Sequence, residues 1–218
     1  MADESTQAPA TGGSGLTIEA IVAVDSPREF RIHPRDRVAA YTAEAAGSRQ
    51  LFTLSLRGAG TPPVQVTASD KSVSDPQWSP DGRRLAFVRE DEIWIVEADG
   101  SRLTKVVAKP GGGRDPRWSP DGRTIYFASY REGRSALWRV DRRTRAIDRL
   151  SAGTGQEGKP SVAADGSRLA YCTHSASADE NDIVLLDRGS GEEIVLPGEN
   201  DDLMPALSPD ETFLVFSS

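Results

Sequence analysis

The side chains best placed to do chemistry in this chain stand at one position of a repeated phrase, where four of five copies carry a charge. Each lies three residues before a hydrophobic anchor residue, and the five are Glu29, Asp75, Asp115, Lys159 and Met204. Three of them are carboxylates, so a shared location would create a partly acidic surface. Such a surface could bind a partner domain or a passing peptide.

Other combinations of residues that catalyse reactions or hold metals are missing from the sequence. His33 and His174 have no neighbouring set of ligands, and an isolated histidine of this kind is more often structural. The single cysteine, Cys172, lies in an apolar run, which favours a small buried hydrophobic side chain. We therefore expect no metal, no cofactor and no catalytic residue in this chain.

Charge and composition narrow the possible partners. The net charge is −7, with both signs interspersed, so the chain offers no basic stripe to nucleic acid and no basic amphipathic helix to a membrane. Residues 1–15 contain no apolar core, which argues against a signal peptide or a membrane span. Their Ala, Ser, Thr, Gly and Pro content favours a disordered leader, and we expect a cytoplasmic protein.

The phrase that carries the candidate residues occurs four times, at 75–87, 115–127, 159–171 and 204–216, with a fainter copy at 29–41. Its anchors recur every 40 to 46 residues, at Ile32, Trp78, Trp118, Val162 and Leu207. This period is the length of one four-stranded propeller blade. The sequence therefore predicts an all-β propeller of four-stranded antiparallel blades, with about four complete blades and a partial fifth.

Each copy specifies a tight turn after its first strand. In Ser79-Pro80-Asp81-Gly82 the proline presets φ, the aspartate suits the third position, and the glycine accepts a positive φ. The corresponding turn residues of the other copies are Pro120, Asp121, Gly122, Asp165, Gly166, Pro209 and Asp210. The following strand, such as Leu85–Val88, is apolar on both faces, which is expected between two blades. Charged residues in each fourth strand suit an exposed outer edge.

The repeats set the domain boundaries. We expect a disordered leader at 1–15 and a short segment at 16–28, in which residues 17–24 fit either a capped helix or a strand. The blades are expected at 29–67, 75–107, 115–151, 159–197 and, in part, 204–218. Because an unfinished blade exposes apolar faces and a strand edge, we expect a truncated part of a longer propeller protein.

In a propeller, the five candidate positions lie at the start of the innermost strands and would surround one mouth of the channel. They are therefore candidates for contact with a partner. The structural alternative is that Asp before Pro simply favours an extended start to the strand. The sequence leaves both interpretations open.

The Trp-Ser-Pro-Asp-Gly motif followed by an aromatic-rich strand resembles the WD-repeat-like repeat of TolB-type propellers and of prolyl oligopeptidase family serine peptidases. The resemblance covers Glu29 to Ser218. Residues 16–28 and the degenerate first blade are most similar to acylaminoacyl-peptidase-like members of the peptidase family. In that family the propeller is non-catalytic, caps an α/β-hydrolase domain and limits which peptides reach the active site. The resemblance implies the same role for this chain.

The resemblance thus implies the propeller portion of a serine peptidase, with a peptide substrate or a C-terminal α/β-hydrolase domain as its partner. The chain contains no Gly-x-Ser-x-Gly motif, because Gly12-Gly13-Ser14-Gly15 has the wrong spacing. The alternative is a TolB-like propeller that binds a protein partner and has no associated enzyme.

Overall fold

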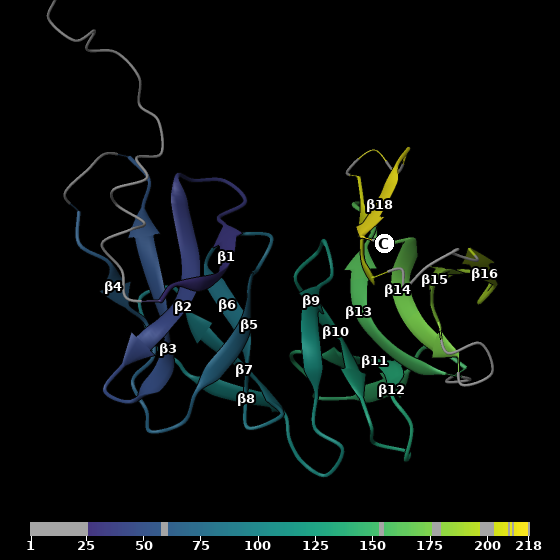
Figure 1. The fold of residues 1–218 in the computed structure, drawn as a ribbon, viewed down its shortest axis with the longest axis horizontal. Helices are drawn as coiled ribbons and strands as arrows, with labels where there is room; N and C mark the ends of the chain where they lie inside the picture. Colours follow the sequence, from purple (N-terminus) through teal and green to yellow (C-terminus); the bar gives the residue numbers. More distant parts are fainter. Residues whose placement is uncertain are drawn as a thin grey trace, which may run out of the picture.

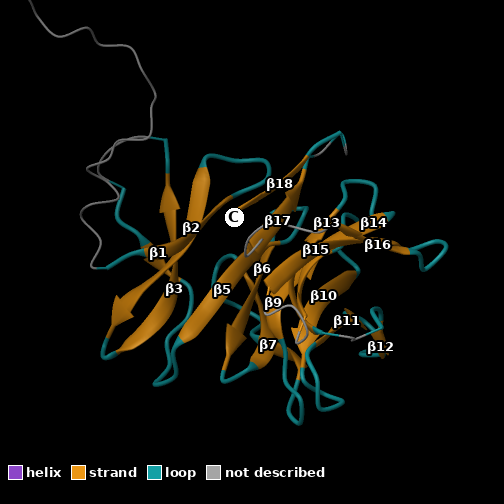
Figure 2. Ribbon diagram, turned by 45° about the vertical axis from the view of Figure 1, so that its right-hand side comes forward, coloured by secondary structure: helices purple, strands orange, loops and turns teal. Residues whose placement is uncertain are grey.

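The chain is described from a computed structural model, which places residues 26–57, 61–152, 155–175, 180–196, 203–208, 210 and 212–217. These residues form strands joined by loops, and none of them is helical (Figure 2). The leader expected at 1–15, the helix or strand expected at 17–24 and the turn residue Pro209 lie outside the described residues. No described segment forms a helix long and apolar enough to cross a membrane.

The strands form four antiparallel sheets of four strands and one sheet of two, and each sheet is a consecutive meander. The first blade contains β1 (Arg28–Ile32), β2 (Val38–Ala45), β3 (Ser48–Ser55) and β4 (Val64–Gln65). The second contains β5 (Val73–Trp78), β6 (Arg84–Arg89), β7 (Glu92–Glu97) and β8 (Thr104–Val107). The third contains β9 (Arg114–Trp118), β10 (Thr124–Ser129), β11 (Ala136–Asp141) and β12 (Ile147–Arg149).

The fourth blade contains β13 (Gln156–Val162), β14 (Arg168–Ser175), β15 (Glu180–Asp187) and β16 (Glu193–Leu196). The last sheet pairs β17 (Leu203–Leu207) with β18 (Leu214–Ser217). The prediction of an all-β propeller with four-stranded antiparallel blades is confirmed.

The inner strands of the blades follow one another through the molecule. β1 contacts β5, β5 contacts β9, β9 contacts β13, and β13 contacts β17. Among the described residues no comparable contact joins β17 to β1, and Figure 1 shows β1 in its left half and β18 in its right half. The described blades therefore form an arc, with the first strand of each blade on its inner side.

The hydrophobic core lies between neighbouring blades rather than within one sheet. One buried cluster joins Leu51 of β3 to Phe87 of β6, and the next joins Ile93 of β7 to Phe127 of β10. A third cluster connects β10 with β14. The second strands β6 and β10 are apolar on both faces because a neighbouring blade covers each face. By contrast, Phe213 beside β18 is 68% exposed.

The turns after the inner strands adopt the geometry that their residue types favour. Gly82 N donates to Ser79 O at 2.8 Å, and Ser79 Oγ donates to Asp81 Oδ1 at 2.6 Å. Gly82 has a φ of 72°, so it occupies the left-handed region that glycine reaches without a steric cost. The third blade repeats this arrangement, and there the Ser119 hydroxyl is the main cause of the lowered pKa of Asp121.

The remaining turn residues have the same structural surroundings. In the fourth blade Asp165 Oδ1 accepts a hydrogen bond from Ser167 N at 2.7 Å, and Gly166 has a φ of 76°. In the last sheet Asp210 Oδ1 accepts a hydrogen bond from Ser208 Oγ at 2.6 Å. Pro80 and Pro120 lie at the second position of their turns, where a fixed φ suits the chain reversal.

His33 connects the first blade to the turn of the second. Its Nε2–H donates to Gly82 O at 3.1 Å, and its ring meets the Trp78 ring edge-on at a centroid distance of 4.7 Å. Arg35 N donates to His33 Nδ1, which is consistent with a proton on Nε2. This histidine therefore has a packing role between blades, as its isolation in the sequence indicated.

Candidate functional site

The five residues named from the sequence all occupy the same irregularity of their inner strands. The pairing with the second strand shifts register there, so that two inner-strand residues oppose a single residue of the neighbour. This arrangement is a β-bulge. The first residue of each bulge has a positive φ, namely 56° at Glu29, 51° at Asp75, 52° at Asp115, 51° at Lys159 and 57° at Met204.

The bulges correct one interpretation of the sequence. An extended aspartate before proline would have a negative φ, but Asp75 and Asp115 stand in the left-handed region, so the extended start to the strand is wrong. In a bulge of this type the first residue has the left-handed conformation, and Asp adopts it more readily than most side chains. The proline that follows has no N–H to offer the sheet, which a bulge tolerates. The Asp-Pro pair therefore specifies a bulge.

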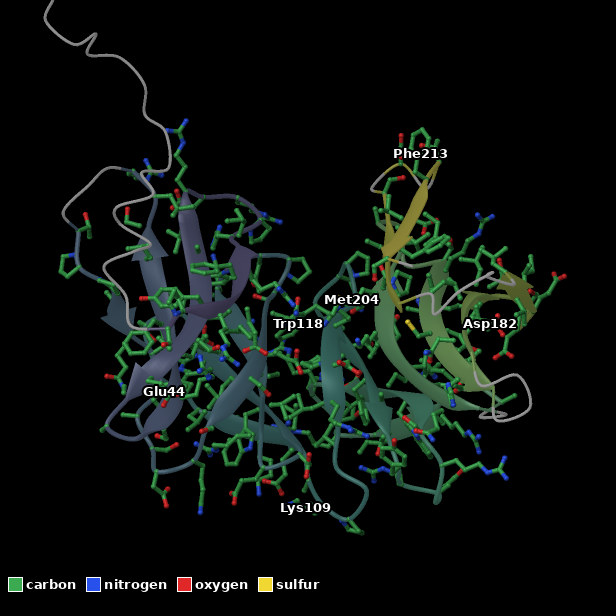
Figure 3. The ribbon with its side chains drawn as sticks, viewed as in Figure 1. Glu44, Lys109, Trp118, Asp182, Met204 and Phe213 are labelled. Atoms are coloured by element: carbon green, nitrogen blue, oxygen red, sulfur yellow. The ribbon has the colours of Figure 1, made fainter. Side chains whose placement is uncertain are left out.

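Two of these side chains, Glu29 and Asp115, join consecutive blades. Glu29 Oε1 accepts a hydrogen bond from Asp75 N at 3.2 Å, while Glu29 Oε2 accepts one from Thr42 Oγ1 at 2.8 Å. Asp115 Oδ2 accepts a hydrogen bond from Lys159 N at 3.2 Å. The structure thus places Glu29 beside Asp75 and Asp115 beside Lys159. Met204, labelled in Figure 3, lies on β17 and is 63% exposed.

Asp75 differs from the other two carboxylates. Within the described part of the chain, its carboxylate accepts no hydrogen bond and forms no ion pair. Burial raises its pKa first, and the like charges of Asp115 and Glu29 raise it further, whereas Arg117 and Arg31 act in the opposite direction. The carboxylates of the first three blades are therefore close enough to repel one another.

Replacing Asp75 with asparagine should stabilise the protein at neutral pH, because it removes the repulsion from Asp115 and Glu29. We expect a gain of about 0.5–1 kcal/mol, the usual strength of a partly screened interaction between charges. Because the pKa of Asp75 is raised on folding, its charge destabilises the folded state above that raised pKa. The destabilisation disappears as the pH falls below the unfolded value of 3.8. Thermal unfolding of both proteins between about pH 3 and about pH 8 measures this difference. Equal stability of the two proteins across that range would contradict the assignment.

A second set of inward-facing residues was missed in the sequence. Each stands directly before an anchor, two positions after a bulge residue, and the set consists of Arg31, Gln77, Arg117 and Ser161. All four line a cavity of about 320 Å³ at the centre of the arc, which we call the central cavity. The sequence does contain a signal for them. The residue directly before each anchor is polar in these four copies of the repeat, its type differs from copy to copy, and the innermost strand of a propeller blade carries it.

The walls of the central cavity include the anchor residues Ile32, Trp78, Trp118 and Val162. The two indoles also hold the blades together, because Trp78 Nε1 donates to Arg31 O and Trp118 Nε1 donates to Gln77 O, each at 3.0 Å. Leu207 N donates to Ser161 Oγ at 3.1 Å and connects the last sheet in the same way. These bonds position the backbone from which the cavity side chains project; Trp118 is labelled in Figure 3.

Several N–H donors of the polar side chains in the central cavity have no partner among the described residues. Arg31 Nη1 and Arg117 Nη1 each donate to the carbonyl oxygen of the preceding residue, at 2.9 and 2.8 Å, and neither guanidinium has an acidic group within 4.0 Å in the described part of the chain. Burial lowers the pKa of Arg117, and the nearby Arg31 charge lowers it further. Among the residues that the structure describes, Gln77 Nε2 has no hydrogen-bond partner, and it is buried. The cavity can therefore donate hydrogen bonds to an anionic or carbonyl-bearing ligand.

The described residues include no group of three or more His, Cys, Asp or Glu side chains close enough to hold a metal ion.

Comparison with known proteins places this geometry in a family context. Residues 24–218 match the family model described as the TolB beta propeller domain. The Tol-Pal system protein TolB of Thioalkalivibrio sulfidiphilus is 35% identical over 80 residues, which cover 34% of this chain and 18% of the relative. The chain thus aligns with less than a fifth of that relative's length.

Two solved structures share the fold. TolB from Acinetobacter baumannii superposes with a TM-score of 0.71 and 21% identity, over 87% of this chain and 48% of that one. A TolB-type structure from Agrobacterium tumefaciens superposes with a TM-score of 0.70 and 21% identity, over 89% of this chain and 78% of that one. The chain spans about half the length of the Acinetobacter protein, and at this identity the likeness concerns the fold alone.

Proposed function

Because the chain belongs to the TolB beta propeller domain family, we propose that it is a protein-binding propeller that takes a segment of its partner at the central cavity. One observation carries the proposal. Four blades each contribute one polar side chain to a single cavity, and within the described residues Arg31, Gln77 and Arg117 keep N–H donors without a partner. A site of this kind serves binding better than stability, since unpaired buried donors lower the stability of the folded state.

The proposal chooses between the two functions that the sequence left open. The family match and the curated relative, whose name assigns it to the Tol-Pal system, favour a protein-binding propeller over the cap of a serine peptidase. The central cavity needs no catalytic domain to be useful, because its lining residues come from the propeller itself. A hydrolase domain as partner has no comparable support.

The chain's four tryptophans provide a test with an internal control. Trp78 and Trp118 line the central cavity, whereas Trp94 and Trp138 lie on the third strands β7 and β11. A library of short random peptides displayed on phage is selected on the immobilised full chain, and the enriched peptides are added to ¹⁵N-labelled protein. We expect the indole signals of Trp78 and Trp118 to shift and those of Trp94 and Trp138 to stay in place. Enriched peptides that shift only Trp94 or Trp138 would overturn the proposal.

A further inference from the structure

Two arginines from different blades share the central cavity. Arg31 comes from β1 of the first blade and Arg117 from β9 of the third, with Gln77 of β5 between them in the order of the blades. Both guanidiniums are partly buried, and each uses one nitrogen to bind its own backbone. Because a guanidinium carries five N–H donors, most of the hydrogen-bonding capacity of both side chains is left for a ligand.

The acidic residues of the bulges do not neutralise these arginines by direct contact. The Glu29 and Asp115 carboxylates accept hydrogen bonds from backbone amides of the next blade, as described above. No ion pair within 4.0 Å joins Arg31 or Arg117 to any carboxylate among the described residues. The Arg31 charge is near enough to lower the pKa of Arg117, while Asp115 and Asp75 act in the opposite direction without direct contact. An anion bound by both guanidiniums would lower the energy of both.

A third donor points to the same kind of ligand. Gln77 lines the cavity, and its Nε2 is buried with no hydrogen-bond partner in the described part of the chain. An unpaired buried N–H is costly, so a rotation of the Gln77 amide that turns Nε2 toward a ligand oxygen would be favourable. A carboxylate has two oxygens with about four lone-pair directions, which is enough to accept bonds from both guanidiniums and one amide.

We infer that the central cavity is a carboxylate-binding subsite, in which Arg31 and Arg117 bind the carboxylate of a peptide and Gln77 supplies a further hydrogen bond. The inference deepens the proposed function and rests on it. The apolar part of the same peptide residue packs against Trp78 and Trp118, which form the wall of the cavity. A volume of about 320 Å³ suits one or two residues of an extended segment rather than a folded surface.

Three short peptides test the subsite and identify the source of the carboxylate. The first is N-acetyl-Ala-Leu with a free C-terminal carboxylate, the second is its C-terminal amide, and the third is N-acetyl-Ala-Glu-Leu amide. We expect the first or the third to shift the Trp78 and Trp118 indole signals and to bind at least about tenfold more tightly than the second. The stronger of the two shows whether a chain end or an acidic side chain is preferred.

Charge-removing variants locate the binding site. Arg31→Gln and Arg117→Gln should each weaken binding of the preferred peptide by at least about tenfold. Arg139→Gln is the matched control, because it removes the same charge from an exposed ion pair with Asp148 and should leave binding unchanged. Circular dichroism and urea unfolding confirm that each variant is folded.

The subsite is overturned if the amide peptide binds as tightly as both carboxylate peptides, or if neither arginine variant changes their affinity. In the first case shifts at Trp78 and Trp118 would still support a protein-binding cavity, so the two proposals fail separately. If no carboxylate peptide shifts these indoles although phage-selected peptides do, the carboxylate subsite alone is wrong.

Discussion

Replacing Trp118 with alanine should lower the free energy of unfolding by about 3–5 kcal/mol, the usual range for truncation of a buried aromatic side chain. Trp118 is 8% exposed and belongs to the core cluster between the second and third blades. Its indole also donates a hydrogen bond to Gln77 O across that interface. The substitution leaves a cavity between two blades and removes this hydrogen bond, and urea unfolding followed by circular dichroism measures the loss.

A conservative variant separates the two contributions of Trp118. Trp118→Phe keeps most of the apolar contact but removes the Nε1–H donor, so it should cost only about 1–2 kcal/mol. Trp78→Phe repeats the test at the neighbouring interface, because Trp78 donates the equivalent bond to Arg31 O at the same distance. A loss below about 1 kcal/mol for Trp118→Ala would mean that the blade interface does not depend on this anchor.

Replacing Asp115 with valine should destabilise the protein by about 2–4 kcal/mol, because two costs add. Asp115 has a φ of 52°, and a β-branched side chain is strongly disfavoured in this left-handed region. The substitution also removes the acceptor for Lys159 N, which belongs to the next blade. Removal of the charge relieves the repulsion of Asp75 and offsets a small part of the loss. Urea unfolding at neutral pH measures the sum.

Two further variants at Asp115 separate the cost of the backbone strain from the cost of the lost hydrogen bond. Asp115→Asn retains an oxygen acceptor and tolerates a positive φ, so it should cost less than about 1 kcal/mol. Asp115→Gly removes the conformational strain but not the loss of the hydrogen bond, and it should fall between asparagine and valine. If valine were tolerated as well as asparagine, the bulge would not require this backbone conformation.

The fold could be predicted from the sequence because the repeat reports it directly. The anchors Trp78 and Trp118 recur at the length of one blade, and Ser79 to Gly82 specifies a turn by residue type alone. The turn depends on neighbours within a few residues, where backbone preference and side-chain type act together, whereas the anchors report a period of constant length. The structure places these residues at the strand ends and turns that the repeat indicates.

The candidate site could be predicted only in part. Glu29, Asp75 and Asp115 were found because they share one repeat position, and the structure places all three in bulges of the inner strands. Their backbone conformation was not predicted, because a residue before proline prefers extended backbone in isolation. Pairing with the second strand overrides that preference, since two residues must there oppose one.

Arg31 and Arg117 show most clearly what the sequence leaves out. They lie far apart in the chain, two other copies of the repeat carry Gln77 and Ser161 at the same position, and each arginine would pass for a solvated charge on a strand. Their shared cavity exists because successive blades bring the first strands together, so that residues of equal position meet.

The sequence by itself determined the blade, its turns and its anchors, because these depend on local residue preferences and on a period of constant length. Only the tertiary structure decided that the Asp-Pro pairs form left-handed bulges, that the Asp115 carboxylate binds the next blade, and that two arginines without an ion pair in the described part of the chain line one cavity. The physical reason is that these features arise between strands and between blades, where packing and charge act across distances that no local pattern records.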